Sequence, residues 1–68
     1  MTLSARNHLK GIVADIQLGD VLAHVTIRVS DSLIESVITR RSAEEMRLKV
    51  GDGVTAVVKA TEVMIAKP

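Results

Sequence analysis

The 68-residue sequence predicts an all-β domain, a small five-stranded Greek-key barrel with one short helix between strands 3 and 4. Three observations predict it. Apolar residues alternate with a period of two along residues 21–30, which is typical of a strand with one buried face. Turn residues separate several short runs of β-branched residues. Only residues 42–46 break this pattern, with a helix-start signature.

The first two strands are predicted to form a β-hairpin. A strand-like segment covers residues 9–18, and Gly11 inside it indicates a bend or a close approach of two backbones. Gly19-Asp20 provides the turn. In residues 21–30 the odd positions are apolar, whereas the even positions become polar toward the end. We therefore expect the odd face of this second strand to be buried.

The second half of the chain contains the helix and three further strands. Ser42 is followed three residues later by Glu45, which predicts a capping box with Ser42 at the N-cap. The strands are those of residues 33–39, 54–58 and 63–66. The order β-β-β-α-β-β is that of the OB-fold. A flat meander with a covering helix is the alternative; we favour the barrel because closure leaves no exposed strand edge.

Composition limits what such a short chain can do. We expect a single domain over residues 1–68. The chain has no cysteine, which excludes disulfides and a zinc ribbon, and two histidines cannot build a tetrahedral metal site by themselves. With 47% hydrophobic residues and a mean hydropathy of +0.29, we expect part of its apolar surface to close against other copies of the chain.

Several classes of function are disfavoured. Small barrels that bind single-stranded nucleic acid use basic grooves and aromatic stacking, whereas this chain has a net charge of +1 and no Phe, Trp or Tyr. No segment reaches the roughly 18 apolar residues of a membrane span, and no export signal precedes the domain, so we expect a cytoplasmic protein. No nucleophile, base and acid show a catalytic spacing, so we do not expect an enzyme. We assign no role to His8 and His24.

Three polar clusters lie at predicted strand ends, at residues 4–7, 39–42 and 59–61. They combine hydroxyls, cations, an amide and backbone N–H groups without a carboxylate, which suits an acceptor-only ligand such as an oxyanion. A helix beginning at Ser42 would add free N–H groups. Simpler interpretations exist for each cluster: a solvated leader, a serine that caps its own helix, and a surface lysine at Lys59.

Several segments match one family pattern in the same order along nearly the whole chain. They are Ser4-Ala5-Arg6-Asn7, Leu9-Lys10-Gly11, Ile38-Thr39, Ser42-Ala43-Glu44-Glu45-Met46, Leu48-Lys49-Val50-Gly51-Asp52 and the run from Val54 to Met64. Together they resemble the molbindin, or Mop, domain, the molybdate-binding member of the TOBE superfamily. The length of the chain resembles that of the free-standing molbindins.

The resemblance implies an OB-fold, a homohexamer built as a trimer of dimers, and molybdate held between subunits for storage or homeostasis. One subunit would contribute Ser4, Ala5 and Arg6, and its neighbour would contribute Thr39, Ser42, Lys59 and Ala60, with Thr61 close by. A tungstate-binding homologue, or a non-catalytic oligomeric module for regulation or assembly, remains the alternative.

The chain departs from the family pattern at two places. Glu62 stands where a small polar residue is common. Because a carboxylate repels a dianion, we expect Glu62 to face away from the site or to pair with a cation. The turn at Asp31-Ser32 lacks the glycine often seen there, which concerns the turn geometry and not the site.

Overall fold

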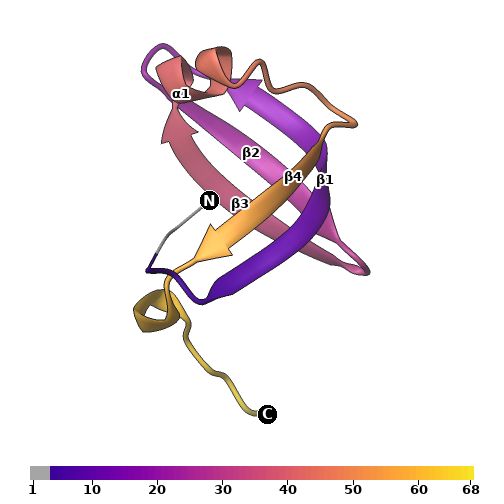
Figure 1. Cartoon of the computed structure of the whole chain (residues 1–68), viewed down its shortest axis with the longest axis vertical. Helices are drawn as coiled ribbons and strands as arrows, with labels where there is room; N and C mark the ends of the chain where they lie inside the picture. The colour runs from indigo at the N-terminus through magenta and orange to yellow at the C-terminus, as the bar shows by residue number, and fades with distance from the viewer. Residues whose placement is uncertain (1–3) are drawn as a thin grey trace.

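The computed structural model describes residues 4–68, which form one antiparallel sheet, a short helix and a 3₁₀ turn (Figure 1). The elements are β1 (Asn7–Leu18), β2 (Leu22–Val29), β3 (Ser32–Thr39), α1 (Arg40–Glu45), β4 (Gly53–Val58) and η1 (Ala60–Glu62). Within this part of the chain the sheet has four strands in the order β3-β2-β1-β4. The predicted all-β class is therefore confirmed, with the helix between the third and fourth strands.

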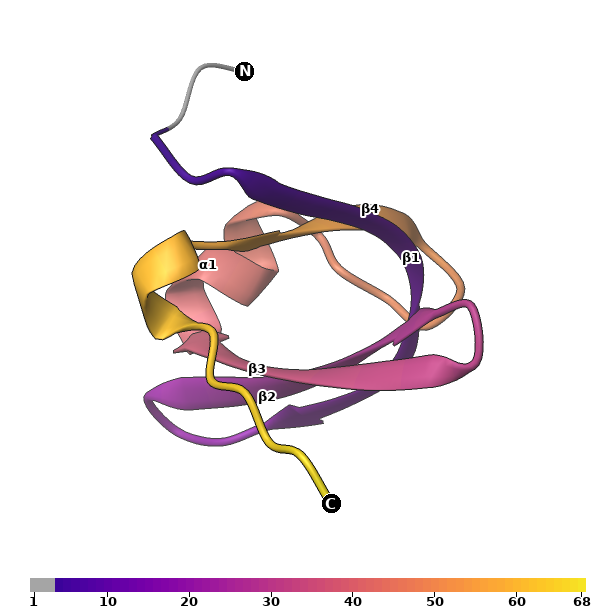
Figure 2. The ribbon, with the colours of Figure 1, turned by 90° about the horizontal axis from the view of Figure 1, so that it is seen from below.

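The sheet curls around an apolar interior. β1 pairs with β4 through its first half and with β2 through its second half, so that β1 and β4 come to lie across from β2 and β3 (Figure 2). The buried core consists of Val13, Val25, Ile27 and Ala56. The odd positions 23, 25 and 27 of β2 are all buried, as the period-two pattern predicts.

A β-bulge in β1 changes which residues face the core. Val13 pairs with Ile27, but Asp15 pairs with Thr26, so the ladder passes over Ala14. The backbone of Val13 instead contacts the loop before β4: its N–H donates to the Asp52 carbonyl at 2.9 Å, and its carbonyl accepts from the Gly51 N–H at 2.9 Å. The bulge anchors this loop to the middle of β1.

Gly11 marks a close approach between β1 and β2. A Cβ atom at this position would lie 2.6 Å from the Arg28 carbonyl oxygen and 2.7 Å from Cγ2 of Ile27. Neither distance leaves room for a methyl group. The sequence-based interpretation of Gly11 is therefore confirmed.

The predicted start of the helix is wrong by three residues. α1 begins at Arg40, and Thr39 is its N-cap, with an extended backbone and a side chain that accepts from the Ser42 N–H at 3.0 Å. Ser42 lies inside the helix, and Glu45 accepts from the Arg41 guanidinium at 3.1 Å. The helix starts early because the Arg40 N–H donates to the Val21 carbonyl at 2.8 Å, which fixes the first helical residue against the β1–β2 turn.

The predicted fifth strand is also wrong for the single chain. Residues 63–66 adopt no strand structure, because η1 turns the chain away from the sheet at the end of β4 (Figure 1). Residues 4–68 thus form an open, curled sheet and not a closed five-stranded barrel. In the same range, no helix has the length and apolar character needed to cross a membrane.

Candidate functional site

The hydroxyls of Thr39 and Ser42 form a hydrogen-bonded pair at the C-terminal end of β3. Thr39 Oγ1 donates to Ser42 Oγ at 2.8 Å and accepts from the Ser42 N–H at 3.0 Å. The Thr39 hydroxyl is therefore used within the chain, whereas the Ser42 hydroxyl keeps its own hydrogen for another acceptor. The expectation of free N–H groups at a helix capped by Ser42 is wrong, because Thr39 is the N-cap and Ser42 lies within the first turn.

The arginines of α1 balance the carboxylates around this pair. Arg40 Nε lies 3.4 Å from Glu44 Oε1, and Arg41 Nε lies 3.1 Å from Glu45 Oε1. The Arg40 guanidinium also donates to the Gly19 carbonyl at 3.2 Å, across the β1–β2 turn. Two acidic side chains near Ser42 are thus paired within their own helix, and the hydroxyls stand in locally neutral surroundings.

The other two predicted clusters lie together at the opposite end of β1. Asn7 pairs with Val58 in the β1–β4 ladder, so the leader before Asn7 and the segment after Val58 leave the sheet side by side. A shallow hollow between them is lined by Asn7, Leu9, Val58, Ala60 and Val63. Of the predicted site residues here, Ala5 is half-buried and the rest are exposed, namely Ser4, Arg6, Lys59, Ala60 and Thr61.

The cations at this end have no acidic partner in the described chain. Within residues 4–68, neither Arg6 nor Lys59 takes part in a salt bridge, and neither does Glu62. Glu62 is exposed in η1, so of the two expectations for it, pairing with a cation is not seen among residues 4–68, and facing away from the site stays a prediction. Arg6 and Lys59 therefore stand ready to pair with an anion from outside the chain.

His8, for which the sequence indicates no role, contacts the leader that precedes β1. The His8 ring Nε2 lies 2.9 Å from the Ala5 carbonyl oxygen, to which it donates. This contact ties the leader back onto β1. The sequence could not predict this contact, because a histidine three residues after an alanine is not a distinctive pattern.

His24 belongs to a second polar cluster, on the outer face of β2 and β3. Its ring contacts the Glu35 carboxylate, which also accepts from Thr26 Oγ1 at 3.1 Å. None of the predicted site residues takes part. In the described part of the chain, no three His, Asp or Glu side chains gather as a metal-ligand set.

One chain therefore holds the predicted donors in two separate groups. Ser4, Ala5 and Arg6 share an end with residues 59–61, whereas Thr39 pairs with Leu22 at the far end of the sheet, beside α1 (Figure 1). Lys59 and Ala60 do not lie beside Thr39 and Ser42 in one chain, although the resemblance implies that all four come from one neighbour. Within one chain, therefore, the predicted donors do not form a single cluster.

The comparisons with known proteins agree with this fold. Residues 3–65 match the family model described as the TOBE domain. The chain belongs to the TOBE domain family. It is 46% identical to "Molybdenum-pterin-binding protein 2" of Clostridium pasteurianum, over 96% of this chain and 97% of that protein. The resemblance to Mop proteins inferred from the sequence is thereby confirmed.

Solved structures of similar proteins share the arrangement of strands and helix. The molybdate-binding protein from Sporomusa ovata superposes with a TM-score of 0.93 at 37% identity, covering 98% of this chain and all of that one. The cytoplasmic molybdate-binding protein ModG, solved with molybdate bound, gives a TM-score of 0.84 at 41% identity. That match covers 88% of this chain and 43% of ModG.

Proposed function

We propose that this TOBE-family protein is a non-catalytic, cytoplasmic molybdate-binding protein for storage or homeostasis. Residues 1–68 would act as a single oxyanion-binding domain, and a homohexamer arranged as a trimer of dimers would hold the anion between subunits. The observation that carries the proposal is the division of the donors between two ends of a fold that matches a molybdate-binding protein over 98% of its length.

The chemistry of the donors suits a tetrahedral dianion. Molybdate oxygens only accept hydrogen bonds, so its site needs donors and no carboxylate directed at the anion; the exposed Glu62 of η1 would have to face away from it. The Ser42 hydroxyl has a free hydrogen, Arg6 and Lys59 have no acidic partner among residues 4–68, and Glu44 and Glu45 are paired with arginines. The proposed ligand residues are Ser4, Ala5, Arg6, Thr39, Ser42, Lys59, Ala60 and Thr61.

A site between subunits explains why each chain carries two incomplete groups. Oxyanion binding between copies requires copies that associate, and the exposed apolar side chains of this chain support association. Leu18, Leu22 and Val37 are all more than half exposed and border one hollow on the outside of the sheet. A protein of this size rarely leaves so much apolar surface in contact with water.

Tungstate remains the second candidate ligand. It is a tetrahedral dianion of nearly the same size, so the same hydroxyls and cations would bind it. Sulfate carries the same charge but is smaller, so the dimensions of the assembled cavity must discriminate against it. Competition between the three anions in one titration series would rank them.

Calorimetric titration with molybdate tests the proposal directly. Lys59→Ala should weaken binding about tenfold to hundredfold, because a hydrogen bond to a charged group contributes roughly 1.5–3 kcal/mol. The control is Lys49→Ala, which removes an exposed lysine from the loop before β4 and should leave the affinity unchanged. Absence of binding by the unsubstituted protein would overturn the proposed function, and equal affinities of the two variants would overturn the role of Lys59.

A further inference from the structure

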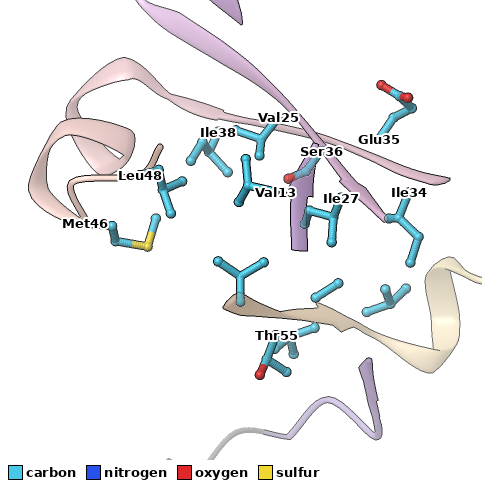
Figure 3. Close-up of a pocket in the computed structure, with 14 residues that line it drawn as sticks. Val13, Val25, Ile27, Ile34, Glu35, Ser36, Ile38, Met46, Leu48 and Thr55 are labelled. Carbon is cyan, nitrogen blue, oxygen red and sulfur yellow. The ribbon is translucent and has the colours of Figure 1, made fainter. Parts of the chain in front are cut away.

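The apolar hollow between β3 and β4 does not suit an oxyanion. It has a volume of about 250 Å³, and its lining is mostly aliphatic, with Ile34 and Ile38 directed into it (Figure 3). Glu35 is the charged residue at its border, and its carboxylate is directed outward, to Thr26 and His24. An anion in this hollow would lose its water and gain few donors. We therefore expect the donors at the strand ends to decide how an anion is bound.

His8 holds the leader before β1 through one hydrogen bond. Its side chain lies on the outer face of β1, because His8 and the buried Val13 are an odd number of residues apart in a stretch that pairs regularly with β4. His8 Nε2 lies 2.9 Å from the Ala5 carbonyl oxygen. Since a carbonyl oxygen only accepts, the hydrogen belongs to Nε2. Among residues 4–68, this is the one side-chain hydrogen bond that reaches residues 4–6.

This bond fixes the orientation of the peptide group between Ala5 and Arg6. A trans peptide group is planar, and its C=O and N–H point in opposite directions; no peptide bond in the described part of the chain is cis. Because the Ala5 carbonyl is directed to the His8 ring, the Arg6 N–H is directed away from that ring. Within residues 4–68 this N–H donates to no acceptor, since the β1–β4 ladder begins one residue later, at Asn7.

A directed N–H without an acceptor, in an exposed segment, is a suitable donor for an anion. Arg6 is exposed, and the β1–β4 pairing brings it to the same end of the sheet as Lys59. The bond from His8 favours anion binding in two ways. It orders the leader before the anion arrives, which lowers the entropic cost of binding. It also polarises the peptide group, which strengthens the Arg6 N–H as a donor.

We infer that His8 is a positioning residue for oxyanion binding, whose ring fixes the Ala5–Arg6 peptide group so that the Arg6 N–H donates to the anion. The inference rests on the proposed function, because it requires an oxyanion at this end of the sheet. It makes Arg6 a ligand through its backbone, whatever its guanidinium adds. It also gives a role to a side chain that does not itself contact the anion.

Calorimetric titration with molybdate compares two substitutions of His8, an exposed residue. His8→Leu removes the donor and should weaken binding about threefold to tenfold, the effect of one lost neutral hydrogen bond. His8→Gln offers an amide N–H to the same carbonyl and should restore most of the affinity. An affinity of His8→Leu equal to that of the unsubstituted protein would overturn the inference. So would a His8→Gln variant that binds as weakly as His8→Leu.

The matched control is His24→Leu. It makes the same substitution at an exposed histidine of β2, away from the leader, and should leave the affinity for molybdate unchanged. A loss in His24→Leu as large as that in His8→Leu would overturn the inference, because the effect would then not depend on the contact with Ala5.

A double substitution separates the backbone of Arg6 from its side chain. Arg6→Ala removes the guanidinium and keeps the peptide N–H. In this background, His8→Leu should weaken molybdate binding by the same factor as in the unsubstituted protein, because His8 acts on the peptide group. Disappearance of the His8→Leu effect in the Arg6→Ala background would overturn the inference, since His8 would then act through the guanidinium.

Nuclear magnetic resonance without molybdate separates this inference from the proposed function. A hydrogen bond to a peptide oxygen moves the resonance of its carbonyl carbon to lower field. His8→Leu should therefore move the Ala5 carbonyl carbon resonance to higher field, and His8→Gln should bring it back. An Ala5 resonance that is the same in all three proteins would overturn the inference even if molybdate binds. The expected Ala5 response without molybdate binding by the unsubstituted protein would overturn the proposed function, and with it the ligand assigned to Arg6.

Discussion

The two ends of the sheet differ in how many hydrogen bonds fix the segments that flank them. At the α1 end, Thr39 caps the helix through Ser42, and Arg40 bonds the β1–β2 turn through its backbone and its side chain. At the other end, the leader is tied back only through the His8–Ala5 contact among the side-chain hydrogen bonds of residues 4–68, and η1 is a three-residue turn. Thr39 and Ser42 are thus held by hydrogen bonds within one chain, whereas Arg6 and Lys59 are held by few such bonds.

Molybdate should therefore act mainly on the loosely held end. At a concentration one hundred times its dissociation constant, a ligand that binds only the folded protein stabilises it by about 2.7 kcal/mol. We expect amide hydrogen exchange to slow more at residues 4–6 and 59–61 than at residues 40–42. Equal slowing of exchange at both ends would contradict this difference between them. Equal slowing by sulfate at the same concentration would contradict a specific effect of molybdate.

The next largest effect is expected on stability, from alanine substitutions at one glycine in β1 and one in β4, the strands that run between the two ends. Gly11→Ala should lower the free energy of unfolding by about 1–3 kcal/mol, since overpacking forces backbone shifts and the new Cβ would meet the Arg28 carbonyl at 2.6 Å. Gly53→Ala is the matched control, because a Cβ there meets nothing within 4 Å. Urea denaturation measures both, and similar losses would show that Gly11 is not a close contact.

Two threonines compare the ends directly. Thr39→Ala removes an N-cap and should cost about 1 kcal/mol of stability, whereas Thr39→Ser keeps the hydroxyl and should restore most of it. Thr61→Ala removes an exposed threonine in η1 at the other end and should change stability by less than about 0.5 kcal/mol. Thermal unfolding at one protein concentration ranks the three variants. A loss in Thr61→Ala as large as that in Thr39→Ala would remove the difference between the ends.

The smallest effect concerns the ion pairs of α1. Arg41 and Glu45 are paired but remain 88% and 66% exposed, and such helix pairs contribute about 0.3–0.5 kcal/mol. A double-mutant cycle with Arg41→Ala and Glu45→Ala should give a coupling of that size in dilute buffer, and almost none in 1 M salt. A larger coupling that persists in salt would mean that the pair helps to hold Ser42 in place.

The regular part of the fold could be predicted because its signal is local. The period-two pattern of β2 places Ala23, Val25 and Ile27 inside without any knowledge of the other strands. The helix start could not be predicted in this way, because Thr39 and Ser42 can both act as caps. What decides between them is the bond from the Arg40 N–H to the Val21 carbonyl, a contact between residues far apart in the sequence.

The site shows the same division between local and non-local information. Residue types and the Mop resemblance single out the donors one by one, but their grouping depends on strand register. Asn7 must pair with Val58 before Arg6 and Lys59 become neighbours, and no local pattern states that pairing. The prediction of a fifth strand is wrong for a related reason. Residues 63–66 have the pattern of a strand, but η1 directs them away from the sheet, where one chain offers no strand to pair with.

The bulge at Ala14 also determines which face of the sheet each of the neighbouring residues of β1 occupies. Val13 and Ile16 both face the core although they are three residues apart, while Asp15 between them is exposed. If Ala14 took a regular place in the ladder and no bulge formed, the strict alternation of a strand would turn Asp15 inward and Ile16 outward. The bulge thus keeps a carboxylate out of the core by taking one residue out of the alternation, so the pattern of apolar residues along β1 is regular only when Ala14 is passed over.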